Sequence, residues 1–316
     1  SLLGEGLDLV IIDEAARMPR KIWDMYLSPT LSDKKGKAIF ITTPNGYNWI
    51  YDLYLLGKQD PKWYSTSSPS WDNYHAFPDG YNDEFLQERK RNLSKEIFDQ
   101  EYGAKFASFQ GKVYPFDRDI DVKKVKYQSH LPTYCTIDFG YRMPAVLFMQ
   151  TYRNNGVWYI NIIDEIIHKK NVATETLAQM ILDKNYPVLH YYGDPAGYNV
   201  QGQTGMGDIE IFKKSGINVR FRTDKASRNI ASSVSYVRGF FESASGERKI
   251  SVSDKCTGII EDFENYRYPE EVEGKTLSND PIKDGFYEHG CDAFRYFITN
   301  RFPMTNNELI RIARWY

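Results

Sequence analysis

The chain has 316 residues, of which 41% are hydrophobic and 26% charged, a composition typical of a globular protein with room for two domains. The formal net charge of −2 at pH 7 excludes a cationic field over the whole surface, so any contact with nucleic acid has to come from local basic patches. The three cysteines show no CxxC spacing and no apolar run is long enough for a membrane helix, which argues against a disulfide framework, a zinc site and a membrane protein.

The first part of the chain has a strand and helix pattern. Residues 7–13 (LDLVIID) and 37–43 (KAIFITT) are continuous aliphatic runs, which are typical of parallel strands buried on both faces. Apolar side chains recur at helical spacing over residues 83–107, and Ser94 can cap a second helix, so we expect a break near residues 92–94. The other elements predicted here are a partly helical stretch at 19–31, a short helix at 47–56 and a strand at 63–68.

A change of composition after residue 107 predicts a domain boundary. Residues 108–132 contain glycine, proline and charged side chains with little periodicity, as expected of a linker. A second domain is predicted over residues 133–316, where three early strands followed by alternating helices and strands indicate a mixed sheet with helices on both faces. The predicted strands are 134–139, 144–152, 157–167, 188–193 and 217–222, with a hairpin-like segment at 244–253. The predicted helices are 172–184, 208–214, 227–243, 255–266 and about 287–300, with a glycine-rich loop at 195–207.

Three aspartates stand where a metal site can form. Asp138 and Asp194 each end a predicted strand, and ligand sites gather beyond the carboxyl ends of the strands of an open sheet. Asp292 lies on the last predicted helix, which can dock on the sheet and direct this side chain toward the other two. Carboxylates within about 4 Å repel one another by roughly 4 kcal/mol per pair, so such a cluster requires protons or divalent cations such as Mg²⁺ or Mn²⁺. Two such ions can support hydrolysis of a nucleic-acid backbone.

Each aspartate also has a structural explanation of its own. An aspartate after a strand can cap the following turn, and Asp292 can pair with Arg295 one helical turn later. The order strand, strand, helix favours the metal site when the three are taken together. Asp164 and Glu165 on a further predicted strand are alternative contributors, for which a partly exposed strand acid is the simpler interpretation.

Asp13 and Glu14 follow an aliphatic run in the pattern of a Walker B strand, where the aspartate holds the Mg²⁺ of a nucleotide and the next acid orients water. The alternative is an acidic turn. The second aliphatic strand ends in the polar segment Thr42-Thr43-Pro44, where P-loop motors often place a sensor. No GxxxxGK[ST] motif occurs in the chain, so we do not expect this chain alone to hydrolyse ATP.

Basic residues are densest in RFRTDKASR, just after a predicted strand and at the same sheet end as Asp194 if that strand is parallel. Cations there can bind phosphates, although a solvated loop is the alternative for any run of charge. The candidate DNA-binding residues are Arg220, Arg222, Lys225 and Arg228. Arg248 and Lys249 are expected in a mobile hairpin beside the cleft, and His289 can orient substrate or simply pack.

Several segments together resemble the large terminase subunit of tailed double-stranded DNA bacteriophages. LDLVIIDEAAR is similar to the Walker B segment of that family, and ITTPNG to its coupling motif. FDQEYGAKFASFQGKVYPF is similar to the segment that leads into the nuclease domain. TIDFGYRMPAV, YYGDPAG and HGCDAFRYFI are similar to the acidic strand ends and the terminal acidic helix of that domain. The resemblance covers nearly the whole chain and depends on the order and spacing of these segments.

The resemblance implies an α/β architecture in which residues 1–107 are the C-terminal portion of a P-loop ATPase domain without its Walker A half, followed by an RNase H-like mixed β-sheet flanked by helices. It implies a two-metal-ion endonuclease that binds Mg²⁺ or Mn²⁺ through Asp138, Asp194 and Asp292 and cuts concatemeric viral DNA during packaging. ATP would serve only the full-length protein. Implied partners are double-stranded DNA, the portal protein, the small terminase subunit and further copies of the chain, in the host cytoplasm and at the procapsid portal. Met143 stands where members often carry a fourth acid.

Two other functions stay open from the residues. A transposase or junction resolvase uses the same arrangement of three carboxylates, although the upstream segment IIDEA argues against it. A non-catalytic module that docks on portal or capsid proteins would use the acids only structurally.

Overall fold

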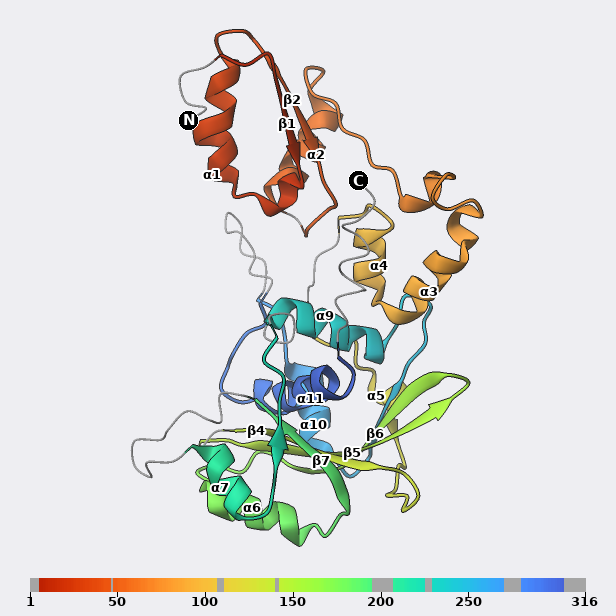
Figure 1. Ribbon diagram of the computed structural model, residues 1–316, viewed down its shortest axis with the longest axis vertical. Coiled ribbons are helices and arrows are strands. Elements are labelled where there is room, and N and C mark those ends of the chain that lie inside the picture. The colour runs from red at the N-terminus through yellow and green to blue at the C-terminus, as the bar shows by residue number, and fades with distance from the viewer. Residues whose placement is uncertain are drawn as a thin grey trace. The chain divides into compact units, whose positions relative to one another are not determined.

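The computed structural model describes residues 6–46, 48–106, 111–139, 142–194, 207–224, 229–269 and 280–303. Contacts within the chain divide it into two compact units, Ser1–Phe109 and Gln110–Tyr316 (Figure 1). In the described part of the chain, no helix combines the length and the apolar character needed to cross a membrane.

The described core of the first unit is a pair of parallel strands with helices on one face. β1 (Leu9–Asp13) pairs with β2 (Lys37–Ile41) residue for residue, as the two aliphatic runs predict. The prediction that both strands are buried on both faces is wrong for this chain. Side chains alternate along the strands, so one face is covered and the other, which carries Ile11 and Ile41, is exposed. The covered face packs in a cluster made of Val10, Ile12, Ala15, Ala16, Leu31 and Ile50. The helices of this unit include α1 (Arg20–Ile22), α2 (Trp49–Gln59), α3 (Glu84–Asn92) and α4 (Lys95–Glu101).

The predicted break in the long helical segment is confirmed. α3 ends at Asn92, and the Ser94 hydroxyl accepts a hydrogen bond from the Ile97 N–H to begin α4. The predicted strand at 63–68 is wrong: the segment pairs with no strand, and Ser65 at its centre is hydrogen-bonded to α2. The Ser65 hydroxyl donates to the Tyr54 carbonyl at 2.7 Å, and Lys58 donates to the Ser65 carbonyl at 2.9 Å.

The second unit contains a mixed sheet which, in the described residues, has seven strands in the order β3-β9-β6-β5-β4-β7-β8. β4, β5 and β6 form an antiparallel meander, and β7, β8, β9 and β3 join it through parallel pairings. The strands are β3 (Val122–Lys123), β4 (Thr133–Asp138), β5 (Ala145–Asn154), β6 (Val157–Ile166), β7 (Val188–Gly193), β8 (Val219–Arg220) and β9 (Ile250–Ser253). The predicted mixed sheet is therefore confirmed.

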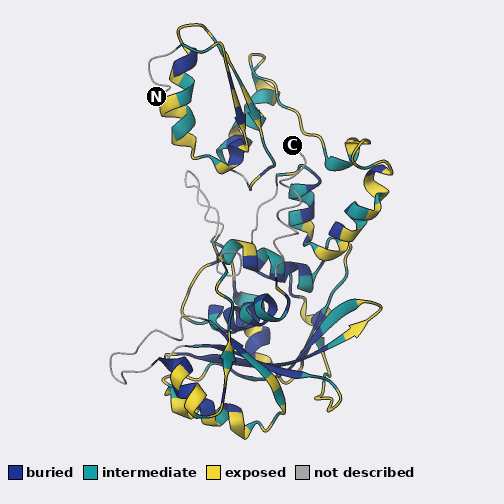
Figure 2. Ribbon diagram, viewed as in Figure 1, coloured by how far each residue is buried: buried dark blue, intermediate teal, exposed yellow. Residues whose placement is uncertain are grey.

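Helices cover both faces of this sheet, which explains why β4 is buried along its whole length (Figures 1 and 2). α6 (Thr174–Asp183) and α7 (Asp208–Lys214) pack on one face, where Ile137 and Phe148 meet Leu177 and Phe212. α9 (Ile230–Phe241), α10 (Thr257–Asn265) and α11 (Glu288–Arg301) lie on the other. Phe241, Phe263 and Phe294 join these three helices through ring contacts of 4.9–5.7 Å.

The segment that composition suggests as a linker packs into the second unit in its described part, residues 111–132. Val113, Tyr114 and Phe116 are buried, and the Tyr114 ring stacks on Phe241 at 5.1 Å. α5 (Arg118–Asp121) follows, and β3 then pairs with β9 at the edge of the sheet. The aromatic side chains bury enough apolar surface to hold the segment down, which its glycine and proline content did not reveal.

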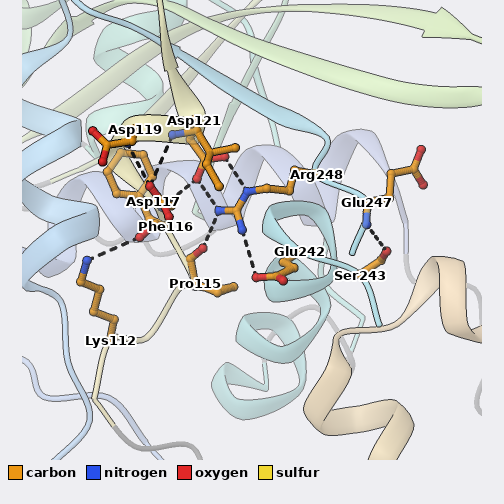
Figure 3. Close-up of polar contacts among 11 residues, drawn as sticks. Lys112, Pro115, Phe116, Asp117, Asp119, Asp121, Glu242, Ser243, Glu247 and Arg248 are labelled. Carbon is orange, nitrogen blue, oxygen red and sulfur yellow. Dashed lines mark hydrogen bonds and ion pairs between the residues drawn. The ribbon is translucent and has the colours of Figure 1, made fainter. Parts of the chain in front are cut away.

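Arg248 clamps this segment to the sheet, which corrects the expectation of a mobile hairpin at 240–253. The guanidinium donates to both carboxylate oxygens of Asp121, at 2.8 and 2.5 Å, and to the Pro115 carbonyl at 2.6 Å (Figure 3). It also donates to Glu242 at the end of α9 at 3.0 Å. β9, which follows directly, lies between β3 and β6. Arg248 is thus a structural residue, and Lys249 is largely buried over the Phe240 ring.

We expect Arg248→Met to lower the free energy of unfolding of the second unit by about 3 kcal/mol, because it leaves the buried Asp121 carboxylate without its cation. Urea unfolding, with hydrogen exchange at residues 250–253 as the local reporter, measures the loss. Arg118→Met is the matched control, since the pair of Arg118 with Glu264 is exposed and its removal should leave the unfolding midpoint almost unchanged. Equal midpoints for the two variants would show that the clamp is dispensable.

Candidate active site

Two of the three candidate aspartates lie side by side at the carboxyl ends of neighbouring parallel strands. Asp138 is the last residue of β4, and Asp194 directly follows β7. The β4–β7 register pairs Ile137 with Gly193, so the next residue on each strand is one of the two acids. Gly193 permits this close approach, since a Cβ there would lie 2.9 Å from the Phe139 ring. The strand-end argument from the sequence therefore agrees with the observed register.

α11 delivers the third aspartate by lying against β4, β5 and β7. The buried Thr136 hydroxyl of β4 donates a hydrogen bond to the Ala293 carbonyl of α11 at 2.8 Å. This bond joins the residue after Asp292 to a residue two positions before Asp138, so it holds the helix in place beside the strand end. His289, Asp292 and Tyr296 are spaced by three and four residues, which places them on one side of α11.

Each aspartate is hydrogen-bonded to a different side chain of α11. His289 Nδ1 lies 2.8 Å from Asp138 Oδ2, and the Tyr296 hydroxyl donates to Asp194 Oδ2 at 2.8 Å. Arg295 donates to Asp292 Oδ1 from Nε at 3.1 Å and from Nη2 at 2.8 Å. The ion pair between Asp292 and Arg295 that the sequence offered as an alternative is therefore present.

The charges of the three candidate acids all affect the pKa of Tyr296. Burial raises the pKa of Tyr296 far above its usual value, and the charges of Asp138, Asp292 and Asp194 each raise it further. Tyr296 is therefore a neutral donor at physiological pH. Of the three acids, Asp194 accepts a hydrogen bond from this hydroxyl.

The surroundings of Asp138 raise the pKa of its carboxyl group. Burial raises its pKa to about 6, the hydrogen bond from His289 opposes the rise, and the charge of Asp292 adds to it. In turn, the hydrogen bond to Asp138 raises the pKa of His289, although burial acts in the opposite direction. The hydrogen bond between Asp138 and His289 thus favours the charged form of both groups, whereas burial opposes it.

The donors suit a hard divalent cation in chemistry, since all three are carboxylate oxygens near one another. Over the described residues, however, no three His, Cys, Asp or Glu side chains form a ready-made metal cluster. One oxygen of each carboxylate is hydrogen-bonded to His289, Arg295 or Tyr296 instead. The assignment of the three aspartates as ligands stays a prediction.

The alternative acids on β6 have structural roles in the described part of the chain. Glu165 accepts hydrogen bonds from the Gly258 and Ile259 N–H groups at 2.8 Å and so stabilises the start of α10. Asp164 pairs with Lys184 at 2.7 Å. Met143 is buried, which agrees with the absence of a fourth acid at that position.

A second buried carboxyl group, which sequence reasoning missed, lies behind α11. Asp262 of α10 is fully buried and lies 2.8 Å from Nε2 of His168. Its other oxygen faces the backbone of α11 at Gly290, where any side chain would overlap with it. Glycine at this position is the only local signal in the sequence, because the partner His168 lies 94 residues away in the chain.

We expect Asp262→Asn to flatten the pH dependence of stability. Burial, followed by the charge of Glu165, raises the pKa of Asp262 to about 9, whereas an unfolded aspartate titrates near 3.9. The native state therefore binds one more proton between these values, and stability falls as pH rises, by up to about 1.4 kcal/mol per pH unit. Urea unfolding from pH 5 to 8 measures the slope, with Asp164→Asn as the control expected to keep it. Parallel slopes for Asp262→Asn and the wild type would contradict a protonated Asp262.

The candidate nucleotide-binding acids lie at the end of β1. Asp13 Oδ1 accepts from the Glu14 N–H at 2.9 Å, and Glu14 has a positive φ of 52° and pairs with Arg17 at 3.4 Å. The hydroxyl of Thr42, just after β2, accepts from the Ala16 N–H at 3.1 Å and so joins the ends of the two strands. This placement is compatible with a Walker B segment, and the role itself stays a prediction.

Two of the four candidate DNA-binding residues belong to the described part of the chain. Arg220 on β8 lies 3.2 Å from the ring of His190, and Arg222 pairs with Asp224 at 2.7 Å. Because β8 is parallel to β7 and pairs Arg220 with Tyr192, Arg220 lies near the carboxyl end of β7. Lys225 and Arg228 lie outside the described residues, as do residues 195–206 of the predicted glycine-rich loop.

The second unit is thus an α/β domain with a mixed sheet and three acids near one strand end. Comparison with known proteins identifies its family. The sequence model of the family described as "Terminase RNAseH like domain" matches residues 138–300, just over half of the chain. The chain belongs to this terminase family, and its second unit has the RNase H-like fold.

Individual relatives agree with the family assignment. The large terminase subunit of Escherichia phage T5 is 28% identical over 311 residues, covering 94% of this chain and 66% of that protein. The large terminase subunit of Thermus phage G20c is 35% identical over 129 residues, covering 36% of this chain and 26% of that protein. A solved structure of the large terminase from a thermophilic bacteriophage has the same fold, with a TM-score of 0.62 at 18% identity, covering 94% of this chain and 70% of that one. The chain thus spans about two thirds, or less, of the curated relatives it matches.

Proposed function

We propose that this chain is the nuclease domain of a large terminase subunit together with the adjoining part of its ATPase domain. Its nuclease would cut concatemeric double-stranded viral DNA during genome packaging. The observation that carries the proposal is the placement of three acids by β4, β7 and α11. Asp138 and Asp194 lie at neighbouring strand ends, and Asp138, Asp194 and Asp292 are each hydrogen-bonded to a side chain of α11. Family membership supports the terminase assignment over the transposase or resolvase alternative.

The chemistry proposed is metal-dependent hydrolysis of a phosphodiester bond. Asp138, Asp194 and Asp292 would hold two Mg²⁺ or Mn²⁺ ions, which supply activation of water and stabilisation of the leaving oxygen. His289 would orient the Asp138 carboxylate through Nδ1. Tyr296 orients Asp194 with a neutral hydroxyl. Asp138 and Asp292 are buried and Asp194 is half-buried, and partial removal from water strengthens the attraction of carboxylates for cations.

Substitution of the three aspartates tests the nuclease. We expect Asp138→Asn, Asp194→Asn and Asp292→Asn each to reduce plasmid nicking in Mn²⁺ by more than about 100-fold, a loss larger than outer-shell partners of a metal usually cause. Asp164→Asn is the matched control, because Asp164 also lies in the sheet but pairs with Lys184. Wild-type cleavage by all three site variants, or none by the wild type, would leave a structural or docking role for the acids.

The first unit is proposed to be the C-terminal portion of a P-loop ATPase domain over residues 1–107. Asp13 and Glu14 would complete a nucleotide site only in a protein that also supplies a Walker A loop, since no GxxxxGK[ST] motif occurs in this chain. The parallel β1–β2 pair and the Thr42 contact to Ala16 support this assignment, because both connect the acidic strand end to the neighbouring strand. ATP would then drive packaging by the full-length protein.

The partners proposed for the full-length protein follow from the same assignment. They are double-stranded DNA, the portal protein, the small terminase subunit and further copies of the chain around the portal. The place of action is the host cytoplasm, with transient docking on the procapsid.

The position of Arg220 near the acids supports a role for the basic segment in binding DNA phosphates, with Arg222, Lys225 and Arg228. We expect Arg220→Ala to weaken binding of a DNA duplex and to reduce the slope of log K against log salt by about 0.9 for each phosphate that the arginine neutralises. Fluorescence anisotropy over a series of NaCl concentrations measures both quantities. Arg153→Ala is the control with the same change of charge, because Arg153 lies at the far end of β5 from Asp138. Identical salt slopes for the two variants would contradict binding of a phosphate by Arg220.

A further inference from the structure

Arg295 is the buried cation of the candidate site, and its hydrogen bonds are unevenly distributed. Its side chain is 5% exposed, and Nε and Nη2 both donate to the same oxygen of Asp292, Oδ1. The nearby charge of Asp292 keeps the pKa of Arg295 above its usual value although burial acts against the charged form. The charged guanidinium therefore makes both of its hydrogen bonds to Asp292 Oδ1 and none to Oδ2.

A purely structural ion pair in the same unit looks different. Arg248 binds both carboxylate oxygens of Asp121, so that pair is saturated within the protein (Figure 3). Arg295 instead converges on a single oxygen, even though a guanidinium can bind a carboxylate through two parallel bonds. The arrangement at Asp292 thus restrains the carboxylate while preserving one oxygen as a potential ligand.

The side chain of Arg295 is in turn held by α9. Its Nη1 donates to the Ser233 hydroxyl at 3.3 Å, and Ser233 is fully buried. The Ser233 hydroxyl donates its single proton to the Ile230 carbonyl at 3.0 Å, so a lone pair of its oxygen is directed at Arg295. The guanidinium also lies over the Tyr296 ring, 4.8 Å from its centre. Three side chains, Asp292, Ser233 and Tyr296, therefore set the orientation of one guanidinium.

We propose that Arg295, supported by Ser233, is a positioning residue that orients Asp292 so that Oδ2 serves as a ligand for a divalent cation. The proposal rests on the proposed nuclease function, because it assigns a role toward the cation that this function requires. Lysine would not replace Arg295, since its ammonium is a single point of contact and lacks the rigid fork that holds Oδ1 from two sides. The oriented carboxylate then gains affinity for the ion without reorganising on binding.

Calorimetric titration of the 316-residue chain with Mn²⁺ alone tests the proposal, together with plasmid nicking over a range of Mn²⁺ concentrations. We expect Arg295→Lys to weaken Mn²⁺ binding about tenfold or more, and Ser233→Ala to weaken it by a smaller factor. Nicking by both variants should recover as the Mn²⁺ concentration is raised, which removal of a purely structural interaction would not produce. Arg248→Lys is the matched control: it alters a buried arginine–aspartate pair elsewhere in the unit and should lower the melting temperature while leaving Mn²⁺ affinity unchanged.

Two results would overturn the proposal in different ways. Wild-type Mn²⁺ affinity in Arg295→Lys, combined with loss of binding in Asp138→Asn, would show that the metal site is real and that Arg295 only stabilises the fold. Unchanged binding in Asp138→Asn would overturn the metal site and the proposal with it. If Arg295→Lys does not fold, Ser233→Ala decides the question, because wild-type affinity in that variant contradicts the support from α9.

Discussion

Mutual repulsion of three carboxylates at one end of the sheet is the constraint that shapes the second unit. Asp138 is already held at a raised pKa of about 6 by burial and by Asp292, so the acids could not stay together without compensation. α11 supplies that compensation with a different group for each acid: an imidazole, a guanidinium and a phenol. A helix that brings a negative charge into the cluster therefore also brings the groups that balance it.

The position of α11 depends in turn on packing contacts and hydrogen bonds of residues that are not proposed to take part in the reaction. The hydrogen bond from Thr136 fixes the position of α11 along β4, and Gly290 allows α11 to pack against Asp262 of α10. Ser233 holds Arg295 from α9. The aromatic cluster of Phe241, Phe263 and Phe294 binds the three helices to one another. Rotation of α11 by a single residue would turn Asp292 and its neighbours away from the strand ends, so this packing decides the geometry of the acids.

The sequence predicted most of the elements because their signals are local. The run ending at Asp13 is continuous and aliphatic, and Ser94 is a cap that needs only the residues next to it. The two strand-end aspartates could be placed together because parallel strands share their carboxyl ends. The role proposed for Arg295 rests on its spacing from Asp292 and on a serine 62 residues earlier, and only the first of these can be read from sequence.

The features that the sequence did not predict depend on contacts between residues that are far apart in the chain. Arg248 was expected on a mobile hairpin, but it contacts Asp121, which is 127 residues away in the chain. Asp262 escaped notice because its partners, His168 and Gly290, come from other elements. β3 is only two residues long and has no periodicity to detect. Single-sequence patterns contain no information on which distant residues meet, so clamps of this kind require a structure.

The order of the elements in the chain has a consequence for synthesis of the protein. β4 and β7 come early in the second unit, whereas residues 288–301 come after every other described helix and strand. A nascent chain that has not reached α11 contains Asp138 and Asp194 but lacks Asp292 and all three compensating side chains. The acidic site can therefore assemble only after the rest of the sheet exists, so a ribosome-bound or prematurely ended chain holds an incomplete site. Synthesis of residues 288–301 is therefore the step that completes the set of acids and their hydrogen-bonding partners.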